Sequence, residues 1–86
     1  SPKEGNPKPF YPLRAIRKKW EGRVILHVEV LQSGTIGVLK TIVSSGYWIL
    51  DQAAIKAVRQ WRFTPAKIAG IAVSSQVQVP VQFKLR

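Results

Sequence analysis

Two stretches of the chain alternate apolar and polar residues, which predicts two strands that are buried on one face. Successive side chains of a strand point to opposite faces, so a half-buried strand places every second residue in the core. Residues 23–31 place four aliphatic side chains on one face: Val24, Leu26, Val28 and Val30. Residues 75–85 place five apolar side chains on one face: Val77, Val79, Val81, Phe83 and Leu85.

A third strand is predicted over residues 36–43, and a tight turn at residues 32–35 joins it to the first strand. Gly34 suits this turn because glycine adopts positive φ without a steric penalty. The alternation is interrupted where Gly37 precedes two adjacent aliphatic residues, Val38 and Leu39. We therefore expect a β-bulge in this strand.

A helix is predicted over residues 49–61, where apolar residues recur at helical spacing. Asp51 lies in its first turn, where a negative charge favours the helix dipole, and Pro65 follows its end. The apolar stripe of this helix consists of Leu50, Ala54, Ala57, Val58 and Trp61. Trp48, just before the helix, either packs against the domain or is exposed.

A second, shorter helix is predicted near the N-terminus. It begins at Pro12, because the missing N–H of proline costs nothing in the first turn of a helix. Its apolar stripe consists of Leu13, Ile16 and Trp20, with Arg14, Arg17 and Lys18 on another face. We expect the helix to end at Glu21-Gly22, with the glycine supplying the C-terminal turn.

The order of these elements predicts an α+β fold with a three-stranded antiparallel sheet. Proline cannot donate to a strand ladder, so Pro80 places the last strand at an edge of the sheet. The helical connection lets the last strand return beside the first, which gives the spatial order 2-1-3. The long helix packs on one face, the short N-terminal helix closes the structure, and residues 67–72 form a loop around Gly70.

Composition argues against an enzyme. The 86 residues include 14 Lys or Arg and 4 Asp or Glu, which gives a net charge of +10, and they contain no cysteine. His27 is the single histidine, whereas acid–base catalysis or metal binding needs several such groups in one pocket. We therefore predict no catalytic residue, no metal site and no cofactor. No run of ~18 apolar residues is present, so this sequence predicts no membrane span.

Several motifs, in this order along the chain, resemble the TonB C-terminal domain. They begin with Tyr11-Pro12-Leu13-Arg14-Ala15 and Glu21-Gly22, and continue with Ser44-Ser45-Gly46 before Leu50-Asp51-Gln52-Ala53-Ala54. They end with Trp61-Arg62-Phe63-Thr64-Pro65-Ala66 and Val79-Pro80-Val81-Gln82-Phe83-Lys84-Leu85. The resemblance covers roughly residues 8–86, nearly the whole chain.

The resemblance implies a non-enzymatic energy transducer of the Gram-negative envelope. Residues 1–9 would be the end of a Pro-rich periplasmic spacer, and residues 10–86 the periplasmic domain. An N-terminal helix, which we expect upstream of this Met-free sequence, would anchor the whole protein in the inner membrane. There a proton-driven motor complex would supply work for the uptake of siderophores, haem, vitamin B12 or similar nutrients.

The partner that the resemblance implies is the TonB box, a short segment of outer-membrane TonB-dependent transporters that adds as a strand to the domain's last strand. The outward-facing parity of Pro80 then selects the binding residues on that strand: Gln76, Gln78, Pro80, Gln82 and Lys84. The family's N-terminal motif adds Phe10, Tyr11, Pro12 and Arg14. Many members carry Gln-Pro-Gln-Tyr-Pro where this chain has Lys8-Pro9-Phe10-Tyr11-Pro12, so Lys8 and Phe10 replace two glutamines.

Two other functions remain as alternatives. A basic nucleic-acid-binding module would explain the charge and the Arg17-Lys18-Lys19 run beside Trp20, but the Gln-rich face of the last strand lacks an aromatic stacking platform. We therefore expect no nucleic-acid partner. An envelope or peptidoglycan adaptor would share the fold. An exposed edge strand also permits self-pairing, so a homodimer is a further possibility.

Overall fold

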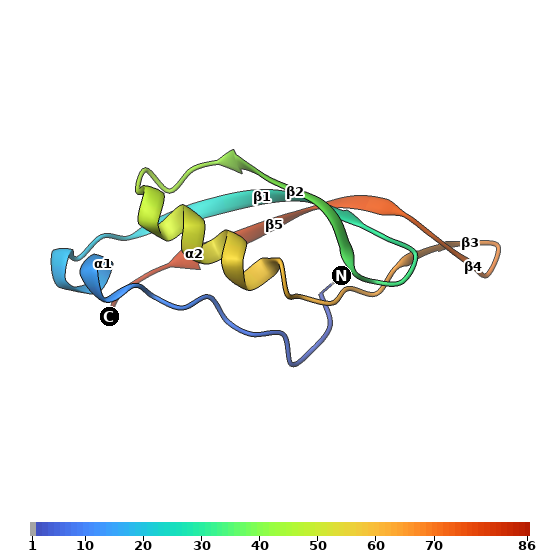
Figure 1. The fold of residues 1–86 in the computed structure, drawn as a ribbon, viewed down its shortest axis with the longest axis horizontal. Helices are drawn as coiled ribbons and strands as arrows, with labels where there is room; N and C mark the ends of the chain where they lie inside the picture. The colour runs from blue at the N-terminus through green and yellow to red at the C-terminus, as the bar shows by residue number, and fades with distance from the viewer. Residues whose placement is uncertain (1) are drawn as a thin grey trace.

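The computed structural model describes residues 2–86, and their architecture is α+β (Figure 1). The elements are α1 (Leu13–Lys18), β1 (Gly22–Val30), β2 (Ile36–Val43), α2 (Trp48–Val58), β3 (Ala66–Ile68), β4 (Ile71–Val73) and β5 (Ser75–Phe83). The main sheet has the order β2-β1-β5 with antiparallel pairs, which confirms the predicted order 2-1-3. The helix α2 has 11 residues, fewer than the 13 expected, because it begins at Trp48 and ends at Val58.

One face of the sheet packs against α2 and forms a single core. The central strand β1 supplies four aliphatic side chains that are at most 1% exposed, as its alternation predicts. The other buried side chains come from α2, β5, α1 and the segment after α2: Leu50, Ala54, Val58, Val79, Val81, Phe83, Ala15 and Phe63. Trp20 and Trp61 are half-buried against this core, whereas Trp48 is 76% exposed.

The predicted β-bulge is present in β2. Between the pairs Val28–Leu39 and Val30–Ile36, β1 advances two residues and β2 advances three. A second irregularity, which the sequence did not indicate, lies between the pairs Ile25–Val43 and Leu26–Thr41. Each extra residue turns the following side chains to the other face of the sheet, which is why the alternation along β2 is imperfect.

The predictions for α1 were wrong about its end and its apolar stripe. The helix ends at Lys18, and Lys19 adopts the left-handed conformation (φ 57°) that we assigned to a glycine. Gly22 is instead the first residue of β1, and a β-carbon there would lie 2.8 Å from Ser45 Cβ. Leu13 and Ile16 are 55% and 42% exposed, because the helix of six residues turns only Ala15 into the core.

The loop expected at residues 67–72 is a short β-hairpin. Strands β3 and β4 pair with Lys67 opposite Ala72, and Ala69 and Gly70 form the turn with φ 51° and 80°. Two consecutive positive φ values are typical of a type I′ turn, which usually carries Asn-Gly or Asp-Gly. Ala-Gly lacks this signal, and three-residue strands show no alternation, so the sequence did not predict the hairpin.

The loop between β2 and α2 is held by the carboxylate of Asp51. Its Oδ1 accepts hydrogen bonds from the backbone N–H of Ser45 (2.9 Å) and from Ser45 Oγ (2.6 Å), and its Oδ2 accepts one from Ser44 Oγ. Partial burial alone would raise the pKa of Asp51. The hydrogen bonds from the two serines together outweigh that effect and hold the pKa below its usual value of 3.8.

Replacing Asp51 with Ala should destabilise the domain by about 1–2 kcal/mol, because several donors lose one charged acceptor. Since the folded state lowers the pKa of Asp51, its stabilising contribution is present above the unfolded pKa and is lost as the pH falls through the lower folded pKa. Urea melts between neutral and acidic pH would measure both effects. A difference between wild type and Asp51→Ala that stays constant across the acid range would contradict the role of the ionised carboxylate.

Candidate functional site

Strand β5 forms an edge of the main sheet, and its pairing partner is β1 alone in the described part of the chain. The register places Pro80 opposite Ile25, Val79 opposite Leu26 and Val81 opposite Val24. Antiparallel pairs alternate between hydrogen-bonded and non-hydrogen-bonded, and Pro80 has no N–H to exchange with Ile25. It follows that the pairs at Val79 and Val81 are the hydrogen-bonded ones.

This register determines the direction of the remaining backbone groups of β5. The N–H and C=O of Gln76, Gln78 and Gln82 share the lateral side of the Pro80 carbonyl, which faces away from β1. The side chains of these residues are exposed on the sheet face opposite α2, where Gln76 Oε1 lies 2.6 Å from His27 Nε2. Lys84 is exposed and lies one residue beyond the end of β5.

The N-terminal segment, residues 2–9, lies against the domain and is held at its middle by a reciprocal pair of amide hydrogen bonds. Asn6 Nδ2 donates to Arg62 O at 2.9 Å, and Arg62 N donates to Asn6 Oδ1 at 2.9 Å. Two further bonds flank this pair, from Lys3 N to Arg62 O at 3.0 Å and from Trp61 Nε1 to Pro7 O at 2.6 Å. These contacts attach the segment to the chain that follows α2.

A hollow of about 500 Å³ separates the N-terminal segment from the middle of β5. Its floor contains Trp61 and Phe63, its outer wall belongs to the N-terminal segment, and its inner wall is the stretch Val77, Gln78, Val79 and Pro80. Because no ladder joins the N-terminal segment to β5, the outward groups of Gln78 and Pro80 remain available to an added strand.

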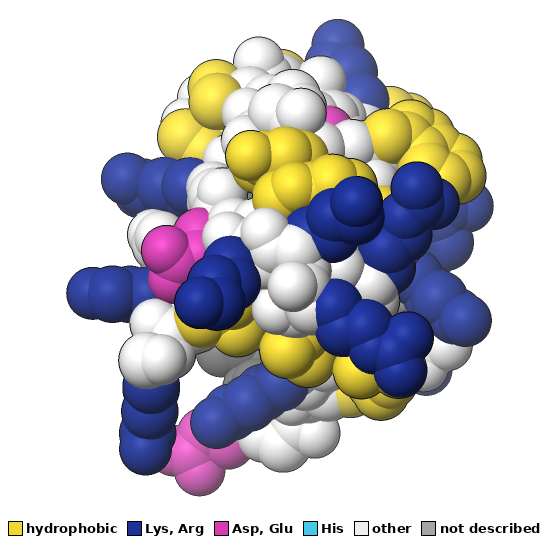
Figure 2. Space-filling model, turned by 90° about the vertical axis from the view of Figure 1, so that its left-hand side faces the viewer, with side chains coloured by type: hydrophobic (Ala, Val, Ile, Leu, Met, Phe, Trp, Pro, Cys, Tyr) yellow, Lys and Arg dark blue, Asp and Glu magenta, His cyan; other side chains and the backbone are white. Residues whose placement is uncertain are grey.

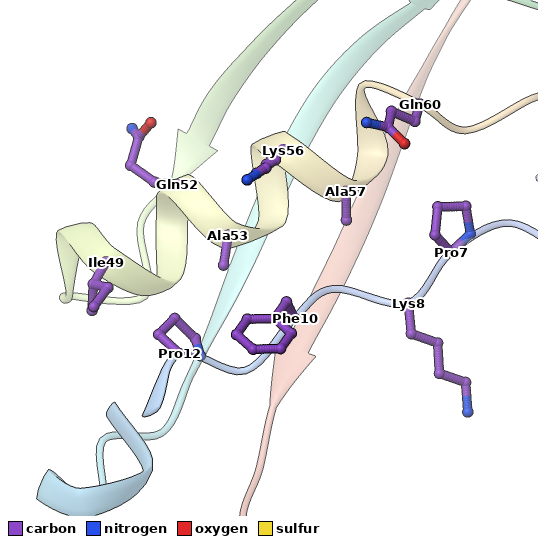
Figure 3. Close-up of a pocket in the computed structure, with 10 residues that line it drawn as sticks. All are labelled: Pro7, Lys8, Phe10, Pro12, Ile49, Gln52, Ala53, Lys56, Ala57 and Gln60. Carbon is purple, nitrogen blue, oxygen red and sulfur yellow. The ribbon is translucent and has the colours of Figure 1, made fainter. Parts of the chain in front are cut away.

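A second groove lies on the other side of the same segment, against α2 (Figure 3). Its volume is about 380 Å³, and the small side chains Ala53 and Ala57 face Phe10 and Pro12 across it. Phe10 is 80% exposed, which is unusual for a large aromatic side chain. Lys8 points away from α2 (Figure 3).

Tyr11 connects the N-terminal segment to the end of β5. Its ring packs edge-on against Phe83 with 5.3 Å between the ring centroids, and its hydroxyl donates a hydrogen bond of 2.5 Å to Trp20 O. Desolvation, and then the negative charge of Glu21, raise the pKa of Tyr11, so the hydroxyl keeps its proton. Arg14 lies over the Trp20 ring, 6.0 Å from its centroid.

The structure brings the predicted site residues together only in part. Gln78 and Pro80 line the hollow at β5, Phe10 and Pro12 line the groove at α2, and Tyr11 packs against Phe83. The other four predicted residues line neither: Gln76, Gln82, Lys84 and Arg14. The sequence did not indicate the outer wall of the hollow, because residues 2–9 resemble an unstructured spacer. Asn6 carried the only local signal, a side-chain amide that can bond a backbone N–H and C=O together.

Residues 2–86 contain no cluster of three His, Asp or Glu side chains that could hold a metal ion. None of the helices in this range is long and apolar enough to span a membrane.

Comparison with known sequences identifies relatives over nearly the whole chain. The family model described as the Gram-negative bacterial TonB protein C-terminal matches residues 7–85. Protein tonB2 of Pseudomonas aeruginosa is 50% identical over 80 residues, which cover 93% of this chain and 30% of the relative. Protein TonB of Vibrio cholerae is 33% identical over 78 residues, covering 91% of this chain and 32% of the relative. The chain thus spans about a third of the length of these relatives.

Two solved structures resemble the fold. The solution NMR structure of the Pseudomonas aeruginosa TonB CTD has a TM-score of 0.79 and 28% identity, and the match covers 99% of this chain and 85% of that one. The Helicobacter pylori TonB-CTD, at 22% identity and a TM-score of 0.70, covers 90% of this chain and 80% of its own, and shares the fold.

Replacing Asn6 with Ala should release the N-terminal segment from the domain. The variant loses both amide bonds to Arg62, so we expect the free energy of unfolding to fall by about 1 kcal/mol. The indole N–H of Trp61, freed from Pro7 O, should shift in the NMR spectrum and exchange faster with solvent. Gln32→Ala, which removes an exposed amide from the β1–β2 turn, is the control. Unchanged exchange at Trp61 in Asn6→Ala would mean that other contacts hold the segment.

Proposed function

The chain belongs to the family of Gram-negative TonB C-terminal domains, and we propose that it binds a short segment of an outer-membrane transporter by β-strand addition at β5. The observation that carries this proposal is the open edge of β5, where Pro80 marks the side that has no neighbouring strand among residues 2–86. Backbone hydrogen bonds would supply the affinity, as in other complexes formed by strand addition.

The surroundings of the edge support this function. Edge strands of monomeric proteins are usually short, charged or covered, because an open ladder invites pairing. Here β5 has nine residues, and its outward-facing stretch carries glutamines and proline, with a hollow beside it. The predicted binding residues remain Gln76, Gln78, Pro80, Gln82 and Lys84 on this strand, with Phe10, Tyr11, Pro12 and Arg14 from the N-terminal side.

In this proposal the domain transmits force to the bound transporter segment and catalyses no reaction. Each net hydrogen bond of an added strand contributes only about 0.5–1.5 kcal/mol in water, so a short transporter segment binds with modest affinity. When the pair is pulled along the strand direction, the bonds of the ladder share the force. Modest equilibrium affinity is therefore compatible with useful mechanical strength.

Family membership also supports a proposal about the larger setting of the domain. We propose that the domain lies in the periplasm and that an inner-membrane anchor upstream connects it to a proton-driven motor complex. The work would open transporters for siderophores, haem, vitamin B12 or similar nutrients. The boundary at residues 9 and 10 stays a prediction, since residues 2–9 contact the domain through Asn6 and Pro7.

Two proline substitutions in β5 test the binding edge. Gln82→Pro removes an outward N–H, so we expect a folded domain whose affinity for a TonB-box peptide is lost or falls at least tenfold. Val81→Pro removes an inward N–H and a buried side chain that is 5% exposed, so it should unfold the domain. Circular dichroism melts and NMR titration with the peptide separate the two effects. Normal peptide binding by Gln82→Pro, or equal destabilisation by both variants, would show that the edge is assigned wrongly.

The salt dependence distinguishes peptide binding from the nucleic-acid alternative. Binding through backbone hydrogen bonds should weaken little between ~50 and ~200 mM salt, whereas binding of a basic protein to DNA should fall by orders of magnitude. Parallel titrations with a TonB-box peptide and a single-stranded oligonucleotide provide the comparison. Tight, sequence-selective DNA binding at the higher salt concentration would favour the alternative.

A further inference from the structure

Half of the basic residues gather at one end of the molecule, which Figure 2 views directly. We define this cationic end by seven side chains from α1, the start of β1 and the chain after β5: Arg14, Arg17, Lys18, Lys19, Arg23, Lys84 and Arg86. The register brings these segments together, because Gly22 pairs with Phe83 and Arg23 with Gln82. All seven side chains are exposed.

The cationic end has little negative charge of its own. Glu21 is the only acidic residue in its segments, and its Oε2 accepts a hydrogen bond of 2.5 Å from the backbone N–H of Leu85. A hollow of about 440 Å³ between α1 and the C-terminal residues is lined by Ile16, Lys19, Glu21, Leu85 and Arg86. The positive potential of this end is therefore left for an external partner.

Apolar side chains lie among these cations. Leu13 and Ile16 are 55% and 42% exposed on α1, and Figure 2 shows yellow apolar surface between the dark-blue side chains. Neither residue contributes to the core, since Ala15 is the buried residue of this helix. A helix that exposes leucine and isoleucine beside arginine and lysine has the composition of a segment that lies in a lipid headgroup layer.

We propose that the cationic end docks on an anionic phospholipid surface. Long basic side chains reach the phosphates, while Leu13 and Ile16 enter the boundary between headgroups and acyl chains. None of these seven side chains lines the β5 hollow, so the proposal goes beyond the binding of a transporter segment there; Arg14 and Lys84 are shared with the predicted binding residues, and the variants below therefore change Arg17, Lys18 and Lys19. The molecule measures 49 Å along its longest axis, and the cationic end lies at one end of that axis (Figure 1), so docking leaves the middle of β5 accessible.

The other polyanionic partners fit this end less well. Nucleic acid would use the cations but gains nothing from exposed leucine and isoleucine, and the half-buried Trp20 is already stacked on Tyr47 at 4.7 Å between centroids. A rigid acidic protein needs its carboxylates placed opposite each cation, whereas fluid lipid headgroups rearrange around flexible lysine and arginine side chains. The mixture of charge and apolar surface therefore favours a lipid layer.

Flotation with lipid vesicles tests the proposal on the intact 86-residue chain. Wild type should bind vesicles that contain phosphatidylglycerol and phosphatidylethanolamine, and should not bind vesicles of phosphatidylcholine. The triple variant Arg17→Gln, Lys18→Gln, Lys19→Gln should bind the anionic vesicles on the order of a hundredfold more weakly, since each cation near an anionic surface contributes about fivefold. The double variant Leu13→Ser, Ile16→Ser should bind them severalfold more weakly while leaving oligonucleotide binding unchanged.

A matched control removes the same charge elsewhere. Lys40→Gln, Arg59→Gln, Lys67→Gln lowers the net charge equally but alters exposed side chains outside the cationic end, so it should bind vesicles nearly as wild type does. Equal loss in the two triple variants would overturn the proposal, because net charge alone would then explain binding. Oligonucleotide binding tighter than vesicle binding at ~200 mM salt would also overturn it. Circular dichroism verifies folding, and unchanged binding of a TonB-box peptide by both triple variants separates this surface from the β5 edge.

Discussion

The pairing of β1 with β5, with Pro80 opposite Ile25, determines how the domain divides its backbone hydrogen bonds. The backbone N–H and C=O groups of Val79, Val81 and Phe83 point toward β1, and the side chains of the same three residues are buried in the core. The alternate set has no strand beside it in the part of the chain that the structure describes. A single residue without an N–H thus excludes a register shifted by one residue, since such a shift would bring Pro80 into a hydrogen-bonded pair and turn valines to solvent.

The chain after α2 determines which residues surround the open edge of β5. Phe63 is fully buried beneath the hollow, and its N–H donates to Gly34 O at 2.8 Å, which ties the chain after α2 to the β1–β2 turn. Gly34 has φ 86°, and a β-carbon there would collide with Phe63 O, so glycine is required for this close approach. The chain held in this way carries Trp61 and Arg62, which in turn hold the N-terminal segment opposite β5. The outer wall of the hollow therefore depends on contacts that reach back to the turn beside the central strand.

The sequence predicts the parts of this arrangement that have a periodic or stereochemical signature. Alternation identifies β1 and β5, and proline identifies the edge and its open side. The motifs that resemble the TonB C-terminal domain include these features, and the match of the family model to residues 7–85 confirms the resemblance. The remaining features depend on long-range contacts that leave no local pattern. The Asn6–Arg62 amide pair, for example, joins residues 56 positions apart. The left-handed Lys19 is a local exception: its N–H and that of Trp20 donate to the carbonyls of Ile16 and Ala15, a capping pattern that usually carries glycine.

The exposed stripe of α1 shows why helical spacing alone does not identify a core. Leu13 and Ile16 have the spacing of a buried face, but a helix of six residues cannot bury both sides of its first turn when Tyr11 and Trp20 already cover the adjacent core. Their exposure supports a docking surface only because cations surround them. The hydrogen bonds of β5 depend on geometry and respond weakly to salt, whereas the cationic end acts through charge and responds strongly. A domain with both surfaces can bind a strand along its side while its end rests on a charged layer, because the middle of β5 offers backbone hydrogen bonds and α1 offers charge.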